Sequence, residues 1–160
     1  MTDGSRTLSS QLDGFRDFMG NLPVAVYTTD AVGFVTYYNR AAEELVGREP
    51  KVGRDRWCVT WRLYWPDGQP MQHEECPMAV ALKENRIIRG AEAIAERPNG
   101  TRFRFTPYPT PIRDGAGAVA SGVNVLVDIT GRSSAESLRK ALAADADRRI
   151  ASVLRLVETV

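Results

Sequence analysis

The sequence has few of the residues on which metal and redox chemistry depends. Among its 160 residues are one histidine, His73, and two cysteines, Cys58 and Cys76. A single histidine excludes mechanisms that need two, and these include most zinc hydrolases. In a reducing compartment the two thiols are expected to be buried or free, not joined in a disulfide bond. His73 and Cys76 would supply only two of the four ligands of a structural zinc ion, so we predict no metal site.

An excess of charge of one sign is also missing, and so is a long apolar run. Lys+Arg number 21 and Asp+Glu 20, for a net charge of +1, which gives no electrostatic case for binding nucleic acid or a membrane surface. The longest apolar segment, residues 123–127, is far shorter than the roughly 20 residues that a membrane span needs. The N-terminus lacks the basic start and apolar run of a signal peptide, so we expect a cytoplasmic protein.

The composition, with 43% hydrophobic and 26% charged residues, fits one globular domain with a tail. The first apolar pattern has the spacing of one helix face that ends before Pro23. Its members are Leu8, Leu12, Phe15, Met19 and Leu22. Two interpretations stay open for this helix: it packs on its own domain, or Leu12, Phe15 and Met19 contact a second copy.

Residues 24–39 predict a strand hairpin, because β-branched and aromatic residues flank a turn at residues 30–33. Asn39 then caps a short helix that ends at Gly47. Residues 48–72 have an irregular pattern but contain all three tryptophans, so we expect them to pack over the sheet. A helix follows, with Pro77 in its first turn.

Three more strands are predicted within residues 87–128, joined by turns at residues 98–100 and 114–117. With the first hairpin they make five antiparallel strands. Pro107, Pro109 and Pro111 share one parity, so the donors they lack all face the same neighbour. We therefore expect the second half of that strand to pair with the last strand alone, and the third strand to lie at the sheet edge.

Beyond Gly131 the pattern changes to that of a helix with a near-heptad apolar repeat and a stutter near residues 145–149. Its apolar positions include Leu138, Leu142, Ile150, Val153 and Val157. A helix with such a stripe needs a partner surface, and a second copy of the same helix in a coiled coil is the simplest one.

This order of elements resembles that of a PAS domain. The resemblance rests on "VYTTDAVGFVTYYNRAAEELVGR" and on "ERPNGTRFRFTPYPTPIRDGAGAVASGVNVLVDITGR". The intervening segment is similar to sensory boxes N-terminal to bacterial sensor histidine kinases. The resemblance implies an α+β fold with a five-stranded antiparallel sheet and helices on one face. It divides the chain into an N-terminal amphipathic helix (1–21), a PAS domain (22–130) and a C-terminal signalling helix (131–160).

The resemblance also implies a function in bacterial two-component signal transduction, as a sensory and dimerisation module. Asp128 and Thr130 would couple the last strand to the C-terminal helix. The expected partners are a second copy of the chain and a histidine kinase or response regulator. No pair of catalytic groups and no glycine-rich nucleotide loop is present, so we do not predict an enzyme. The alternative is a protein-interaction module that senses nothing.

The identity of any ligand or cofactor stays unknown at this point. Candidate ligand-pocket residues are Trp57, Cys58, Trp61, Tyr64, Met71, Met78 and Leu82, with Arg54, Arg56 and Arg62 nearby for an anion. His73 is a candidate haem ligand for a gas or redox sensor, although the adjacent carboxylates favour a charged surface group. Flavin-binding PAS domains carry a reactive cysteine in the run GRNCRFLQ. The corresponding text, "GRDRWCVTW", has a displaced cysteine, so a flavin is disfavoured.

Overall fold

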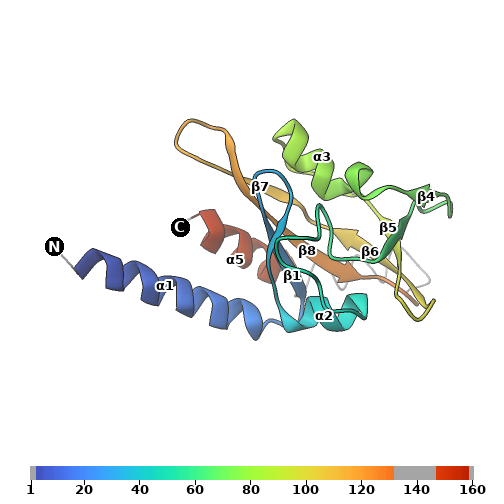
Figure 1. Ribbon diagram of the computed structural model, residues 1–160, viewed down its shortest axis with the longest axis horizontal. Coiled ribbons are helices and arrows are strands. Elements are labelled where there is room, and N and C mark those ends of the chain that lie inside the picture. The colour runs from blue at the N-terminus through green and yellow to red at the C-terminus, as the bar shows by residue number, and fades with distance from the viewer. Residues whose placement is uncertain (1–2, 132–146, 159–160) are drawn as a thin grey trace.

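The computed structural model describes residues 3–131 and 147–158, with side chains within residues 10–131 and 149–155. The elements in chain order are α1 (Asp3–Gly20), β1 (Ala25–Asp30), β2 (Val35–Tyr38), α2 (Arg40–Val46), β3 (Arg62–Tyr64), β4 (Pro70–Met71), the 3-10 helix η1 (His73–Glu75), α3 (Pro77–Glu84), β5 (Ala93–Glu96), β6 (Arg102–Pro107), β7 (Thr110–Arg113), β8 (Val119–Asp128) and α5 (Asp147–Glu158). Figure 1 shows a single sheet with helices around it, which confirms the α+β class.

The sheet has eight strands, so the prediction of five is wrong. Its order is β2-β1-β8-β6-β5-β3-β4, and β7 pairs with β8. Two of the extra strands come from the aromatic segment, which forms a hairpin with Leu63 opposite Met71. This hairpin pairs with β5, so the prediction that β5 lies at the sheet edge is wrong. The third extra strand arises because the prolines divide one long strand into β6 and β7.

The proline-rich strand behaves as the parity of its prolines predicts. β6 pairs with both β5 and β8, whereas β7 pairs, among the described strands, with β8 alone. Tyr108 lies between the two and donates its amide to the carbonyl of Val125 at 2.9 Å. The register with β8 continues without an inserted residue from Pro107 to Thr110. The missing donors therefore face away from β8.

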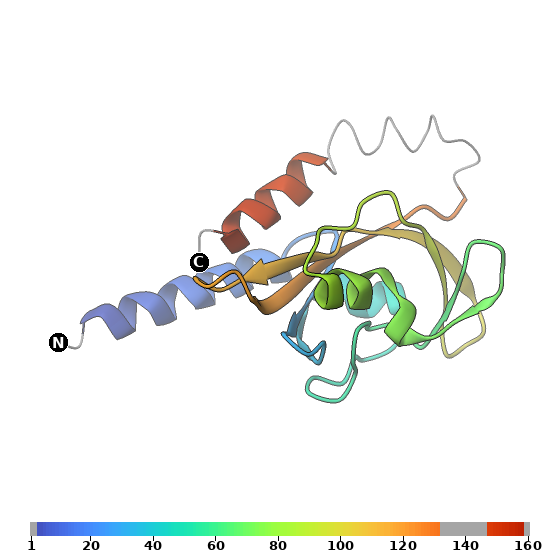
Figure 2. The same cartoon turned by 90° about the horizontal axis from the view of Figure 1, so that it is seen from above.

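Each face of the sheet is covered by different helices. On the inner face, α2 and α3 pack on a core that includes Tyr27, Phe103 and Leu126. On the outer face, the C-terminal end of α1 and helix α5 pack on a second cluster that includes Val123 and Val125. Figure 2 shows α3 and α5 on opposite sides of the strands. The alternation along β8 explains this arrangement, because successive side chains point to opposite faces.

The predicted N-terminal helix is confirmed as α1, which ends at Gly20 before Pro23. Met19 is fully buried in the outer cluster and Phe15 is partly buried there, so this end of the helix packs on its own domain. Leu12, further from the body, is 45% exposed. Figure 1 shows the N-terminal half of α1 extending away from the sheet.

Helix α5 also packs on its own chain. Ile150 and Val153 are 5% and 2% exposed, against the outer face of the sheet. A sheet face of the same chain thus covers these two residues, because it buries an apolar stripe as well as a second helix does, and their contact with a partner helix stays a prediction. Leu138 and Leu142, and the side chain of Val157, lie outside the described residues. No described helix has the length and apolarity that crossing a bilayer requires.

Asn39 joins three elements at the base of α1. As predicted, it caps α2, and its Oδ1 accepts from the amides of Ala42 and Val26, both at 3.0 Å. Its Nδ2 donates to the carbonyl oxygens of Met19 at 2.9 Å and Val24 at 2.8 Å. The side chain is buried, and these four bonds use its full capacity. Asn39 therefore fixes the position of α1 relative to β1 and α2.

Candidate functional site

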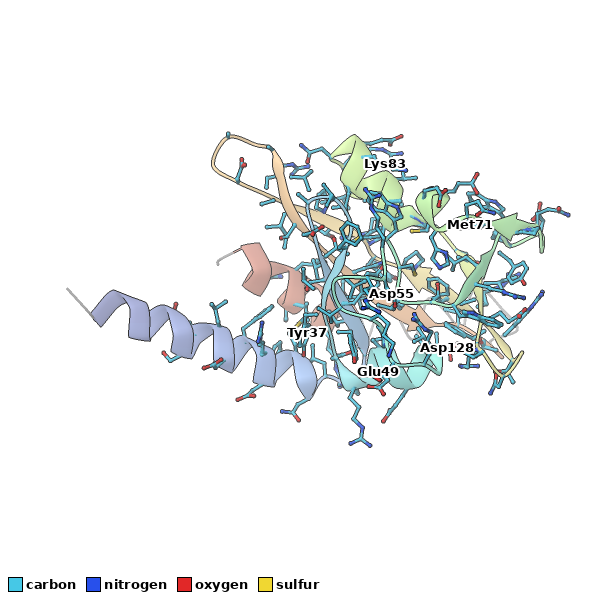
Figure 3. The ribbon with its side chains drawn as sticks, viewed as in Figure 1. Tyr37, Glu49, Asp55, Met71, Lys83 and Asp128 are labelled. Atoms are coloured by element: carbon cyan, nitrogen blue, oxygen red, sulfur yellow. The ribbon has the colours of Figure 1, made fainter. Side chains whose placement is uncertain are left out.

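A groove opens on the helical side of the sheet, between the loop that follows α2 and the helices η1 and α3. Its volume is about 600 Å³. It is lined by Arg48, Arg54, Asp55, Arg56, Trp57, Cys58, Thr60, Trp61, His73, Glu74 and Lys83. We call it the basic groove, because arginine and lysine side chains outnumber carboxylates in its lining. In Figure 3, Asp55 marks the loop side of the groove and Lys83 the α3 side.

Trp57 forms the floor of the basic groove and has an unusual backbone conformation. Its φ is 70°, in the left-handed region that non-glycine residues seldom adopt. Its amide donates to the carbonyl of Gly33 at 2.7 Å, and its indole ring occupies the space where a β-carbon of Gly33 would lie. Strained backbone of this kind is found preferentially at functional sites. Trp57 is therefore the centre of the candidate site.

The charges of the basic groove are only partly balanced. Arg48 and Asp55 form an ion pair at 2.6 Å, and Arg48 also donates to the carbonyl of Val59 at 2.9 Å. Arg56 donates to a carbonyl, as does Lys83. The structure gives these two side chains, and that of Arg54, no carboxylate partner among the described residues. The groove therefore has unneutralised positive charge.

A chain of hydrogen bonds leads from Trp57 through the sheet. The Tyr27 hydroxyl donates to the Trp57 carbonyl at 2.8 Å and accepts from Asn124 Nδ2 at 3.0 Å. Asn124 Oδ1 accepts from the amide of Tyr108 at 3.0 Å. Burial raises the pKa of Tyr27 well above its usual value, so the phenol stays neutral and both donates and accepts. We call Trp57, Tyr27, Asn124 and Tyr108 the cross-sheet chain. It begins under the groove and ends in the outer cluster.

Both cysteines are free and buried beside this chain. Burial raises the pKa of each thiol, which keeps both protonated and unreactive at neutral pH. Cys58 Sγ accepts from the Thr60 hydroxyl at 3.2 Å. Cys76 Sγ accepts from the amide of Ala79 at 3.5 Å and so caps α3. Both residues have structural roles in the inner core.

The predicted pocket residues separate into two groups. Trp57, Cys58, Met71, Met78 and Leu82 are buried together in the inner core. Trp61 is 38% exposed and Tyr64 is half-buried on β3. Five of the seven predicted residues therefore pack against one another as core, and Trp57 and Cys58 also line the groove together with Trp61.

The end of β8 is tied to β6 by the residues predicted to couple strand and helix. The amide of Arg104 donates to the Thr130 hydroxyl at 2.8 Å, and the amide of Ile129 donates to the Arg104 carbonyl at 2.8 Å. Asp128 Oδ1 accepts from the amide of Thr130 at 2.8 Å. Both polar side chains thus accept from main-chain amides at the end of β8, and their role in coupling strand to helix stays a prediction (Figure 3 labels Asp128).

An antiparallel sheet in which the first hairpin pairs with the last strand, with short helices on the inner face, is the architecture of a PAS sensory domain. The resemblance seen in the sequence agrees with it. A family model described as PAS fold matches residues 19–134, and the chain belongs to this family.

Several solved structures share this fold. The Rhodobacter sphaeroides LOV protein has a TM-score of 0.70 and 19% identity, over 95% of this chain and 84% of that one. The blue-light activated histidine kinase EL346 of Erythrobacter litoralis has a TM-score of 0.64 and 21% identity, over 91% of this chain and 45% of that one. An RNA-binding light-oxygen-voltage receptor has a TM-score of 0.59 and 22% identity, over 84% and 38% of the two chains. Among curated proteins, none matches.

The residues of this chain do not fit a flavin or a haem. The inner core is occupied by Tyr27, Trp57 and Met78, which are 0%, 8% and 1% exposed. The Cys58 thiol, its pKa raised by burial, is unsuited to attack a ring. His73 Nε2 lies 3.0 Å from the carbonyl oxygen of Thr60, to which the Nε2–H tautomer donates. The imidazole is thus turned toward the loop of the groove. Within residues 3–131 and 147–158, no three His, Cys, Asp or Glu side chains are placed to hold a metal ion.

Two residues in or beside the candidate site were missed in the sequence. Tyr27 reads as an ordinary strand aromatic, and Lys83 as a helix residue that favours the C-terminal end of α3. Gly33 gave a partial signal, because glycine in a tight turn also permits close approach of another side chain. That Trp57 packs over Gly33 can be seen only in the folded structure, because the two residues are far apart in the chain.

Proposed function

We propose that this PAS domain is a sensory module in which the state of the loop around Trp57 is relayed through the sheet to helix α5. The observation that carries the proposal is the cross-sheet chain. It connects the Trp57 carbonyl on the groove side with the amide of Tyr108, whose ring packs in the same outer cluster as Ile150 and Val153. A change at the groove thus has a physical route to the surface on which α5 lies.

The mechanism is a shift between two populations. A ligand or partner that favours another conformation of Trp57 breaks or lengthens the bond to Tyr27, and Asn124 then changes its hold on Tyr108. Because α5 binds the outer face through few large side chains, a small change there alters the fraction of molecules with α5 docked. Asp128 and Thr130 contribute by fixing the end of β8 from which the chain continues toward α5.

Hydrogen–deuterium exchange of the α5 amides tests this relay. Tyr27 lies on the face of the sheet opposite α5, yet Tyr27→Phe should increase amide exchange in residues 147–158. Val46→Ala, in the inner core but outside the cross-sheet chain, is the control for general loss of stability. Val153→Asp gives the reference for undocked α5. If Tyr27→Phe and Val46→Ala variants of equal stability show equal α5 exchange, the relay does not exist.

We further propose that the module acts as a homodimer within a two-component pathway. Leu12 and Phe18 on α1 are 45% and 41% exposed, and exposed large apolar residues on a projecting helix support assembly. A histidine kinase or response regulator is the proposed partner, supported by the likeness to a blue-light activated histidine kinase. Light scattering should give the mass of a dimer, and Leu12→Asp should reduce it to that of a monomer. A monomer at micromolar concentration contradicts the homodimer.

A further inference from the structure

We infer that the basic groove binds a small dianion, such as a phosphate ester or a dicarboxylate, directly over Trp57. Its role as the input of the sensor rests on the function proposed above, but the binding itself does not. The groove lies outside the filled inner core, so this ligand would not replace core side chains.

The first support is the set of three cations that lack a carboxylate partner among the described residues. The Arg54 side chain makes no hydrogen bond or ion pair there, and the Arg56 guanidinium donates through Nε alone, to the Val32 carbonyl at 2.7 Å. Lys83 Nζ donates to the Glu74 carbonyl at 2.8 Å. A guanidinium has five N–H donors and an ammonium three, so most donors of these side chains stay available.

The second support is the geometry around the indole of Trp57. The Arg56 guanidinium carbon lies 4.4 Å and the Lys83 nitrogen 5.0 Å from the ring centroid. The same ring therefore holds two positive charges from different parts of the chain, one from the loop and one from α3. Like charges brought together repel each other, and a dianion between them would relieve that repulsion. Both cations are held in place before binding, which lowers the entropic cost of the complex.

The third support is the state of the acidic lining residues. Asp55 is already paired with Arg48 at 2.6 Å and accepts from the amide of Lys51 at 2.9 Å, so it does not compete for the free cations. The carboxylate of Glu74 has no ion pair among the described residues, and it weakens the positive field at the rim. The volume of about 600 Å³ is within the range of small-molecule sites.

Isothermal titration calorimetry with the full chain tests the inference, with inorganic phosphate and malonate as dianionic probes and sodium chloride to keep ionic strength constant. At least one probe should bind with 1:1 stoichiometry. Because a charge-assisted hydrogen bond is lost, Arg56→Gln and Lys83→Gln should each weaken binding roughly tenfold. Arg40→Gln, in an exposed pair with Glu44 outside the groove, should leave the Kd unchanged.

A substitution of opposite sign makes the test specific. Glu74→Gln removes the unpaired carboxylate and should tighten binding several-fold, whereas Glu43→Gln on α2 should not. Absence of binding by both probes, or equal weakening by Arg56→Gln and Arg40→Gln, overturns the inference. Binding that leaves α5 exchange unchanged would instead contradict the relay and retain the site, so the two failures are distinguishable.

Discussion

Asn124 Nδ2 donates to the hydroxyl of Tyr27 at 3.0 Å in the inner core, although 97 residues separate them in the chain. The two residues are register partners on adjacent strands, β8 and β1. The bond lets one amide side chain serve both Tyr27 and the main chain of Tyr108. In a largely apolar interior, such a bond specifies one arrangement of the strands, because leaving either group unpaired is costly.

Replacement of the Tyr27 hydroxyl is therefore expected to destabilise the fold. Tyr27→Phe removes the hydroxyl that binds the Trp57 carbonyl and Asn124 Nδ2. Each of these groups loses one hydrogen bond, at a cost of roughly 1–3 kcal/mol in the free energy of unfolding. Urea denaturation followed by fluorescence measures this value. Tyr38→Phe is the control, because the Tyr38 hydroxyl makes no hydrogen bond among the described residues, and its effect should stay within about 0.5 kcal/mol.

The packing of Trp57 on Gly33 can be separated from backbone strain. Gly33 and Gly68 have φ values of 94° and 89°, so alanine is strained at both positions, by about 1–2 kcal/mol. Gly68 has open space around it, whereas a β-carbon at Gly33 would overlap the Trp57 ring. Gly33→Ala should therefore cost about 1–3 kcal/mol more than Gly68→Ala, and it should change the Trp57 fluorescence. Equal losses would show that the ring moves aside freely.

Asn39 should be needed for the attachment of α1. Asn39→Ala removes an N-cap and leaves buried groups of Met19 and Val26 with fewer partners, at an expected cost of about 2–4 kcal/mol. Asn21→Ala removes one exposed bond to the Asp17 carbonyl and should change stability little. Exchange of the α1 amides should rise more for Asn39→Ala than for Asn21→Ala. The reverse order would mean that apolar packing of Met19 alone holds the helix.

The bonds of Glu96 with Arg102 and Tyr64, on the outer face, predict that the stability of the fold depends on pH. Glu96 accepts from Arg102 Nε at 2.9 Å and from the Tyr64 hydroxyl at 3.1 Å, and the bond from Arg102 is the main cause of the lowered pKa of Glu96. A pKa below the unfolded value of about 4.3 means that the carboxylate stabilises the fold above that pH and loses its effect as pH falls through the folded pKa. Glu96→Gln should therefore reduce stability at pH 7 and lose its effect in strong acid.

Urea titrations at several pH values provide the check for Glu96. Glu43→Gln is the control, since Glu43 is exposed and forms no ion pair among the described residues. A difference between wild type and Glu96→Gln that is constant down to pH 2 would show that the carboxylate charge is not the cause.

Local signals in the sequence predicted the parts of the fold that depend on local chemistry. Asn39 and Gly47 were recognised as the two ends of α2, because capping uses residue types that differ from helix interiors. Pro107, Pro109 and Pro111 predicted the partner of β7, because the parity of missing donors is fixed by an extended backbone.

The parts that depend on distant partners could not be predicted in the same way. The strands β3 and β4 have three and two residues, and β4 begins with a proline, so neither gives a recognisable period. Ile150 and Val153 mark an apolar stripe, but a stripe does not identify the surface that covers it. In the site, Arg54 and Arg56 were noted as anion ligands, whereas the approach of Lys83 to Trp57 depends on how α3 lies across the loop.

The row of prolines in β6 and β7 has a consequence for solubility. On the side away from β8, Pro109 and Pro111 have no amide donors, and the Pro109 carbonyl already accepts from the amide of Ile88 at 3.4 Å. A strand from another molecule cannot continue a regular ladder along such a border, since every second bond would be missing. The same residues that end the pairing with β5 thus disfavour aggregation through strand pairing on this side of the sheet.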